Sequence, residues 1–410
     1  MTRAGRGEML KRGLLVTATL SAGLLAAVGS GAAQAAPTSA RTSAHTSKPR
    51  PASAAWLYGV KATSRTNAWA VGAFDHADGF ATLIEHWNGK TWKYAPSGLN
   101  IPENADSLTG IAATSARSAW AAGTISSQYS FPLIDHWRGG QAWTRDQTPT
   151  PGGDGGAAYL NGVGAASPGD AWAVGAYLPE LAATQTMILH WTGKQWVQVP
   201  SPSPGGDSST SYSMLSGVAV LSPTNAWAVG RSSTGQPSAH QMTLIEHWNG
   251  TKWTTVPSPD PSRAGCVSDE LSAVAASRTG TWAVGDACGA SLVLRLEGGT
   301  WRQVPSPAPA AGVSEQLTSV TVTAATNAWA VGNIAGKVLI LHWNGMKWAR
   351  TAAPAPAGAK PAVLTGVSAV SSSAAWAVGE ADYPRNVRKL LIERWNGTRW
   401  KLVPVPNPTP

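Results

Sequence analysis

Residues 67–92 read NAWAVGAFDHADGFATLIEHWNGKTW, and variants of this stretch recur six more times along the chain. Each copy begins with an L-x-[GAS]-[VI] segment, continues through AWAVG and HWNG, and ends on a further Trp with a Pro-rich tail. The first Trp of the copies recurs every 47 to 55 residues, at Trp69, Trp120, Trp172, Trp227, Trp282, Trp329 and Trp376. Reuse of one unit also explains 21 Trp beside only 3 Phe and 7 Tyr. The period predicts a repeat array whose units complete their cores against their neighbours.

Each copy has the pattern of four short strands, because period-2 segments alternate with turn signals. In the AWAVG strand, Trp69 and Val71 point to one side while Ala68, Ala70 and Gly72 point to the other. Asn-Gly pairs favour tight hairpins before the last strand, whereas 28 to 31 residues separate the third Trp from the next AWAVG Trp and allow a crossover. We therefore expect an all-β protein, a seven-bladed β-propeller of four-stranded antiparallel blades with no strand exchanged between blades.

The first strand of each copy carries a small residue at its third position, which we expect nearest the crowded axis of the ring: Gly59, Gly110, Gly162, Gly217, Ala273, Ser319 and Gly366. The expected propeller covers residues 57–408, with blades near 57–98, 108–150, 160–203, 215–259, 271–307, 317–355 and 364–408.

Residues 1–35 have the pattern of a signal peptide: basic residues through Arg12, an apolar run over 13–29, and small residues ending in Ala33-Gln34-Ala35. Residues 36–56 are rich in Ser, Thr, Pro and Ala and predict a disordered leader. We expect cleavage after Ala35 and a secreted, extracellular, monomeric protein with no membrane contact after cleavage. The alternative is an uncleaved membrane anchor.

The net charge of +9 is concentrated at the N-terminus. Seven of the 31 Lys and Arg and one of the 22 acids precede residue 57, which leaves a net charge of +3 on the propeller. A balance this small implies no nucleic-acid partner.

The repeats resemble the seven-bladed kelch and galactose-oxidase-like propellers, in which a Gly ends the second strand and aromatic residues follow on the third and fourth. AWAVG…HWNGxxW also resembles the repeats of photosystem-assembly propellers and of sialidase-type blades with an Asp box, although the acid of that box is missing here. Similar Trp-rich AWAVG/HWNG repeats are associated with secreted actinobacterial proteins. The resemblance implies a fold and a compartment, and no particular activity.

Residues that recur in every copy are better explained as architecture than as an active site. His86, His136, His190, His247 and His342 all precede the second Trp, with Arg295 and Arg394 in the other two copies, and the ring spreads them apart; we expect no metal and no cofactor. Similarly, Glu85, Asp135, Glu246 and Glu393 are expected to be structural partners of buried polar groups. The Trp rows are interpreted as inter-blade core rather than sugar-stacking platforms.

The residues that break the repeat concentrate in the connection between the second and third strands, which is long in copies 1 to 4 and 7. Binding sites favour variable loops on a rigid scaffold. The candidate ligand-binding residues are Phe74, Asp75, His76, Asp78, Tyr129, Phe131, Tyr177, Arg231, Glu380, Asp382 and Tyr383. Residues 75–79 could also hold a cation, and Asp75 or Asp78 could meet Glu380 or Asp382 across blades 1 and 7 as a glycosidase pair.

The two cysteines, Cys266 and Cys288, lie in the crossover entering blade 5 and in that blade's connection between its second and third strands. These segments emerge on one face, which predicts a disulfide.

The catalytic residues stay unknown. The sequence favours a secreted, non-enzymatic propeller that recognises a carbohydrate or protein through this face. The alternatives are a carbohydrate-active hydrolase or lyase that uses carboxylates there, and a purely structural role.

Overall fold

Every repeat forms one four-stranded antiparallel sheet in the computed structural model, with its strands hydrogen-bonded in chain order. The structure describes residues 52–76, 79–97, 104–152, 156–179, 182–236, 240–261 and 268–408. The signal peptide and most of the leader lie outside these residues, so cleavage and secretion stay predictions. Among the described residues there is no helix of the length and apolarity that crossing a membrane requires.

The first four blades have the following strands. Blade 1 contains β1 (Ala55–Ser64), β2 (Asn67–His76), β3 (Gly79–Trp87) and β4 (Trp92–Tyr94). Blade 2 contains β5 (Ser107–Ser115), β6 (Ser118–Ser126), β7 (Ser130–Trp137) and β8 (Thr144–Arg145). Blade 3 contains β9 (Ala157–Ser167), β10 (Asp170–Leu178), β11 (Gln185–Trp191) and β12 (Trp196–Gln198). Blade 4 contains β13 (Tyr212–Ser222), β14 (Asn225–Ser233), β15 (Met242–Trp248) and β16 (Trp253–Thr255).

The last three blades repeat this order. Blade 5 contains β17 (Asp269–Ser277), β18 (Gly280–Ala287), β19 (Ala290–Glu297) and β20 (Thr300–Gln303). Blade 6 contains β21 (Glu315–Ala324), β22 (Asn327–Ile334), β23 (Lys337–Trp343) and β24 (Trp348–Arg350). Blade 7 contains β25 (Ala362–Ser371), β26 (Ala374–Tyr383), β27 (Val387–Trp395) and β28 (Trp400–Leu402).

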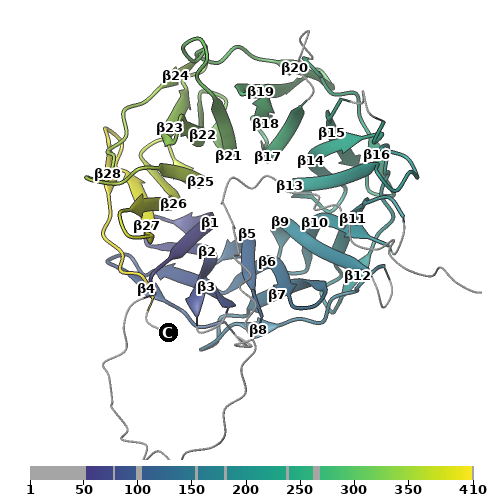
Figure 1. Cartoon of the computed structure of the whole chain (residues 1–410), viewed down its shortest axis with the longest axis horizontal. Coiled ribbons are helices and arrows are strands. Elements are labelled where there is room, and N and C mark those ends of the chain that lie inside the picture. The colour runs from purple at the N-terminus through teal and green to yellow at the C-terminus, as the bar shows by residue number, and fades with distance from the viewer. Residues whose placement is uncertain are drawn as a thin grey trace, which may run out of the picture. The chain divides into compact units, whose positions relative to one another are not determined.

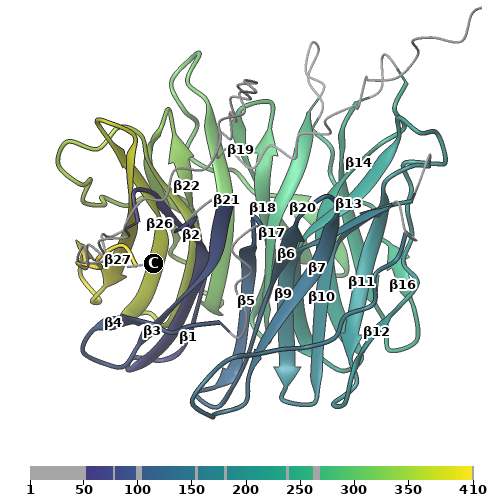
Figure 2. The ribbon, with the colours of Figure 1, turned by 60° about the horizontal axis from the view of Figure 1, so that its bottom comes forward.

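The blades form a ring with the first strand of each sheet innermost (Figure 1), and β1 contacts both β5 and β25. This confirms the predicted seven-bladed propeller. In an antiparallel meander, the turns between first and second strands and between third and fourth strands share one side of the ring, which we call the turn face. The loops between second and third strands and the crossovers share the other side, the loop face. Figure 2 shows the strands running between these two sides.

Tryptophan packing joins each blade to the next, as the sequence predicted. Trp69 of blade 1 packs against Trp137 and Trp143 of blade 2, with ring centroids 5.2 and 5.1 Å apart. Trp376 of blade 7 packs in the same way against Trp87 and Trp92 of blade 1, at 4.9 and 5.1 Å. The same interaction therefore closes the ring.

A β-bulge interrupts every inner strand one residue after its conserved Leu, for example between Leu57 and Gly59. The bulge brings a backbone carbonyl against the Gly of AWAVG: a Cβ at Gly72 would lie 1.9 Å from the Trp56 oxygen. The small third-position residues meet the next blade, and a Cβ on Gly110 would lie 3.0 Å from the Gly162 Cα. The Gly of AWAVG and the small third residue of the first strand are therefore both consequences of the bulge.

In four blades the residue at the bulge also links its blade to a neighbouring one. Asn161 Nδ2 donates to the Leu215 carbonyl at 2.8 Å, and Thr109 and Thr318 donate their hydroxyls to the Leu160 and Leu364 carbonyls at 2.8 and 2.9 Å. Thr365 of blade 7 donates to the Leu57 carbonyl of blade 1. Blade 1 departs from this pattern, because Tyr58 occupies its bulge.

The first and last described residues of the propeller also meet at the junction of blades 7 and 1. Asn407 Nδ2 donates to the carbonyls of Ala52 and Arg388 at 3.0 and 2.8 Å, and its Oδ1 accepts from the Leu390 amide at 3.3 Å. The Ala52 amide donates to the Pro408 carbonyl at 2.9 Å. This clamp holds both ends of the propeller without an exchanged strand.

We predict that Asn407→Ala lowers the free energy of unfolding by ~1–3 kcal/mol, because three partly buried backbone groups lose their partner. Chemical denaturation measures the change. The control is Gln198→Ala, which removes an exposed amide of β12. Equal stability of the two variants would show that the clamp does not contribute to ring closure.

The acidic residues of the third strands differ from their expected role. Asp135 accepts a hydrogen bond from Arg145 Nε at 3.2 Å, as expected of a structural partner. Glu246 and Glu393, however, have no hydrogen-bond partner among the described residues, and both side chains are fully buried. They occupy the position that holds Leu189, Leu294 and Leu341 in blades 3, 5 and 6. The prediction of a structural partner was therefore wrong for these two glutamates.

Burial raises the pKa of Glu246 and of Glu393 to about 8 each. A carboxyl with a higher pKa in the folded than in the unfolded state is neutral in both states at low pH. As the pH rises from the unfolded pKa through the folded one, folding must retain a proton that the unfolded chain releases. These two residues therefore weaken the fold progressively from about pH 4 to about pH 8.

We predict that the double variant Glu246→Leu, Glu393→Leu melts at a higher temperature than the parent at pH 8. The expected gain is on the order of 1–3 kcal/mol per site, and it should shrink as the pH approaches 4. Calorimetry across this range measures it. Leu341→Glu, the reverse exchange, should lower the melting temperature with the opposite pH trend. A double variant less stable than the parent at pH 8 would contradict the assignment.

Candidate functional site

The residue after the AWAVG glycine points toward the next blade at the loop-face end of the inter-blade core, because it lies two positions beyond the buried Val. In blades 1 to 3 this residue is small: Ala73, Thr124 and Ala176. In blades 4 to 7 it is polar: Arg231, Asp286, Asn333 and Glu380. The loop face therefore has a charged half and a half with smaller, more apolar side chains.

A polar network joins blades 4, 5 and 6 in the charged half. Arg231 is ion-paired with Glu270 of β17, and Gln316 Nε2 of β21 donates to the other Glu270 oxygen at 3.1 Å. Both charged side chains are about nine-tenths buried. Burial, together with the nearby Glu270 charge, raises the pKa of Asp286 to about 6 against the lowering effect of its hydrogen bond from the Gly289 amide. Arg231, a candidate ligand-binding residue, is thus held by a blade-to-blade ion pair.

A second group of side chains, which we call the junction cluster, lies where blades 7 and 1 meet and comprises Trp56, Phe80, Glu380, Asp382 and Arg388. Arg388 binds both carboxylate oxygens of Asp382, with its Nη2 2.6 Å from Oδ2. Its guanidinium lies 5.4 Å from the centre of the Trp56 ring, which packs edge-on against Phe80 at 5.3 Å. The side chains of Asp382 and Arg388 keep about a quarter and a fifth of their surface exposed.

Glu380 lies two residues before Asp382 on the same face of β26 and is buried. Its Oε2 has no hydrogen-bond partner among the described residues. Burial raises the pKa of Glu380 to about 7, although the Arg388 charge opposes the change. Tyr58, at the bulge of β1, also has a raised pKa, through burial and the nearby Glu380 charge. The cluster thus places a buried carboxyl with a raised pKa beside the ion-paired carboxyl of Asp382.

The remaining acidic candidates reach this cluster indirectly. Ser53 Oγ donates to Asp75, and the Arg388 amide donates to the Ser53 carbonyl at 3.0 Å, so Asp75 and Asp382 are linked through Ser53 and Arg388. Asp78 lies outside the described residues, so the candidate cation site of residues 75–79 stays a prediction.

The aromatic candidates divide by exposure. Tyr129 and Phe131 of blade 2 are 39% and 38% exposed, two residues apart at the start of β7. Tyr177 donates its hydroxyl to Gln185, and Tyr383 lies under Lys389, whose Nζ is 4.8 Å from the ring centre. Phe74 is only 2% exposed, so our expectation of an exposed Phe74 was wrong; β2 continues through His76 and its alternation turns Phe74 into the core.

This strand extension also corrects the expected long connections in blades 1 and 7. The additional residues lengthen paired strands: β2 pairs with β3 as far as His76 and Gly79, and β26 pairs with β27 as far as Tyr383 and Val387. In blades 5 and 6, two-residue connections join the same strands, as expected.

The histidines are structural in the way that the repeat predicted. His86 stacks on Trp69 at 4.0 Å, and its Nε2 lies 2.8 Å from Asn67 Oδ1. In blade 7, Arg394 takes this place and lies 5.1 Å from the Trp376 ring centre. Within the described part of the chain, no three His, Cys, Asp or Glu gather as metal ligands do.

Sequence reasoning missed Trp56, Tyr58, Glu270, Gln316 and Arg388. For all of these except Arg388, the signal was present in the columns of the repeat, because the residues just before and after the conserved Leu vary from blade to blade. Loop length drew attention to the connections instead of to these strand ends.

We predict a disulfide between Cys266 and Cys288. Cys266 lies outside the described residues, but the Cys288 amide donates to the Ser268 carbonyl at 3.0 Å. Two residues span at most ~7 Å, so the chain between Cys266 and Ser268 is compatible with the bond. Peptide mapping without reductant should find the linked pair. Reduction should lower the free energy of unfolding by about 3 kcal/mol in the chain-entropy model. Two alkylatable thiols in the unreduced, unfolded protein would contradict this.

No protein-family model matches the chain, and no curated protein sequence matches it. Solved structures with a similar fold include YCF48 from Cyanidioschyzon merolae, at 16% identity and a TM-score of 0.49, covering 85% of this chain and 97% of that one. The β-propeller domain of the Trilobed protease from Pyrococcus furiosus has 10% identity and a TM-score of 0.49, with 86% and 99% covered. The fucose-recognising Aleuria aurantia lectin, described as six-bladed, has 13% identity and a TM-score of 0.44, with 86% and 96% covered. Similarities this distant carry no functional argument, so the fold assignment rests on the strand order of the chain itself.

Proposed function

We propose that the protein is a secreted, non-enzymatic propeller that binds a carbohydrate through its loop face. The observation that carries the proposal is the exposed pair Tyr129 and Phe131 at the edge of blade 2. A pyranose has an apolar face that stacks on an aromatic ring, and two neighbouring rings offer a platform for consecutive sugars. The large aromatic side chains of the repeat itself are used in the core, so this exposed pair departs from the architecture.

The junction cluster supports the same function. Asp382 and Arg388 present a fixed, partly exposed carboxylate–guanidinium pair beside Trp56. Such a pair offers acceptors and donors to sugar hydroxyls without the entropy cost of ordering two flexible side chains. Blade 1 lies between this pair and the Tyr129 platform, which favours an extended glycan over a single sugar.

Hydrolysis is the second candidate, and Glu380 is the observation that favours it. A carboxyl with a pKa of about 7, next to the ion-paired Asp382, has the two environments that a glycosidase gives its acid and its carboxylate. Two features favour binding instead: Glu380 is only 5% exposed, and Arg388 occupies both Asp382 oxygens.

We predict that the double variant Tyr129→Ala, Phe131→Ala binds its glycan at least ~10-fold more weakly, because each stacked ring contributes about 1 kcal/mol or more. Glycan arrays and polysaccharide pull-down identify the ligand, and titration measures the change. The matched control is Tyr94→Ala, Leu402→Ala, which removes apolar side chains of similar exposure, 37% and 40%, from outer strands.

Unchanged affinity in the folded double variant would overturn the proposed site. Absence of glycan binding by the parent would overturn the function. Release of shortened sugars by the parent, lost in Glu380→Gln, would replace binding by hydrolysis.

A further inference from the structure

The turn face has a one-sided charge that the repeat does not require. Its fourteen turns, two in each blade, contain nine Lys and Arg and no Asp or Glu. Every blade contributes at least one of these basic residues: Arg65, Lys90, Arg117, Arg138, Lys194, Lys252, Arg278, Lys347 and Arg399. All nine are exposed. We call this set the basic ring.

Few carboxylates neutralise the basic ring. Arg138 is the only one of the nine with a salt bridge among the described residues, to Asp146 at 2.7 Å. The two acids nearest the turns are already engaged: Asp170 accepts from His190 at 2.8 Å, and Glu297 is paired with Arg295 at 3.4 Å. The other eight cations are exposed and have no salt bridge to a described carboxylate, although Arg65 donates to Ser373 Oγ at 2.6 Å.

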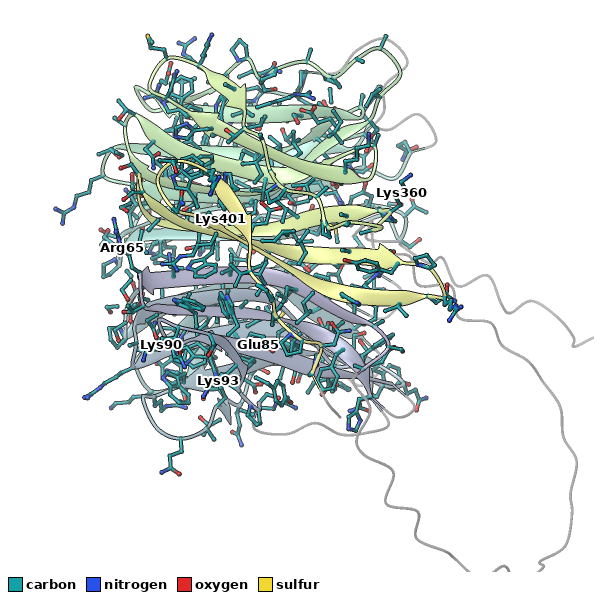
Figure 3. All side chains as sticks on the ribbon, turned by 90° about the vertical axis from the view of Figure 1, so that its left-hand side faces the viewer. Arg65, Glu85, Lys90, Lys93, Lys360 and Lys401 are labelled. Atoms are coloured by element: carbon teal, nitrogen blue, oxygen red, sulfur yellow. The ribbon has the colours of Figure 1, made fainter. Side chains whose placement is uncertain are left out.

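The opposite, loop face carries charges of both signs. The described acids near it include Asp75, Asp207, Asp260, Glu270, Asp286, Glu315, Glu380 and Asp382. The described cations near it include Arg231, Lys337, Lys360, Arg385, Arg388 and Lys389. Figure 3 shows Arg65 and Lys90 of the turn face at one end of the blades and Lys360 of the loop face at the other. The net charge of +3 on the propeller, which argued against a polyanion, thus hides a difference between two faces: the turns hold cations and no acids, whereas acids and cations are mixed on the loop face.

We propose that the turn face docks on the surface of a bilayer containing anionic phospholipids. The turns lie at one end of every blade, so a planar surface can meet all seven blades at once, whereas a linear polymer crosses only part of a ring. Each basic residue near an anionic surface adds to the attraction. Met346, in the turn of blade 6 beside Lys347, is 83% exposed and provides one apolar contact on this face. The loop face then points away from the lipid, where it stays open to a ligand.

The test uses the full chain and sedimented vesicles of equal parts phosphatidylglycerol and phosphatidylcholine, with pure phosphatidylcholine for comparison. The variant is Lys194→Glu, Lys252→Glu, Lys347→Glu. The matched control makes the same charge change on the loop face: Lys337→Glu, Lys360→Glu, Arg385→Glu. All proteins share the basic N-terminal residues, so any difference between them reports the propeller faces.

We expect the parent to bind the anionic vesicles, to release them at high salt and to ignore phosphatidylcholine. The turn-face variant should bind at least ~100-fold more weakly, because each basic residue near the surface accounts for about fivefold. The loop-face variant should bind as the parent does.

Three outcomes would overturn the proposal. The first is no binding to anionic vesicles at low salt. The second is equal loss in both triple variants, which would indicate a net-charge effect. The third is binding of the parent to polyphosphate or DNA but not to vesicles, which would assign the basic ring to a soluble polyanion. None of these depends on the carbohydrate site, since the variants leave Tyr129, Phe131 and the junction cluster unchanged.

Discussion

The propeller depends on the packing of one tryptophan against the next blade, and at five of the seven junctions this tryptophan contacts two tryptophans there. Because the rows close from Trp376 onto Trp87 and Trp92, every blade has a partner on both sides. A single blade could not bury these rings, so the core exists only when the ring is complete. The indole groups cover the outer part of each junction, and the bulge hydrogen bonds, such as Asn161 to Leu215, hold the inner part. The Asn407 clamp acts in addition at the one junction that no crossover spans, where it fixes the two ends of the propeller.

The bulged inner strand connects this architecture to the candidate site. It requires the glycine of AWAVG within the second strand, because a Cβ there would lie about 2 Å from a carbonyl oxygen. This close approach restricts only the glycine, and the side chain of the next residue lies at the edge of the core. That position is therefore free to vary, and it holds Arg231, Asp286, Asn333 and Glu380 in four blades. The charged half of the loop face therefore arises at the residue after the glycine, where core packing no longer restricts the side chain.

The repeat predicted the fold because the strand pattern, the turn residues and the Trp spacing all agree in seven copies. It predicted the inter-blade role of the Trp residues and the structural role of the His residues for the same reason. It could not predict that Phe74 is buried, because the extension of β2 past the consensus depends on pairing with β3. The Asp382–Arg388 pair was equally invisible, since its register follows from the length of a hairpin rather than from any motif. An alignment of the repeats also does not predict contacts between nonequivalent positions of two blades, such as that of Arg231 with Glu270.

The repeat leaves the residue type open at two kinds of position. One holds the buried glutamates of the core, and the other holds the exposed cations of the turns. At the position of Glu246 and Glu393, leucine is found in three blades, so the acid is tolerated because the other junctions stabilise the ring. In the turns, the backbone sets the demands: Asn249, for example, accepts from the amides of Thr251 and Lys252, and the side chain of Lys252 has no role in the turn. The charge of such a side chain has little effect on folding, so its sign can be selected by the surface that the turn face contacts. That the sign is positive in all seven blades, while acids remain at the opposite end, is therefore better explained by a surface that the turns contact than by the fold.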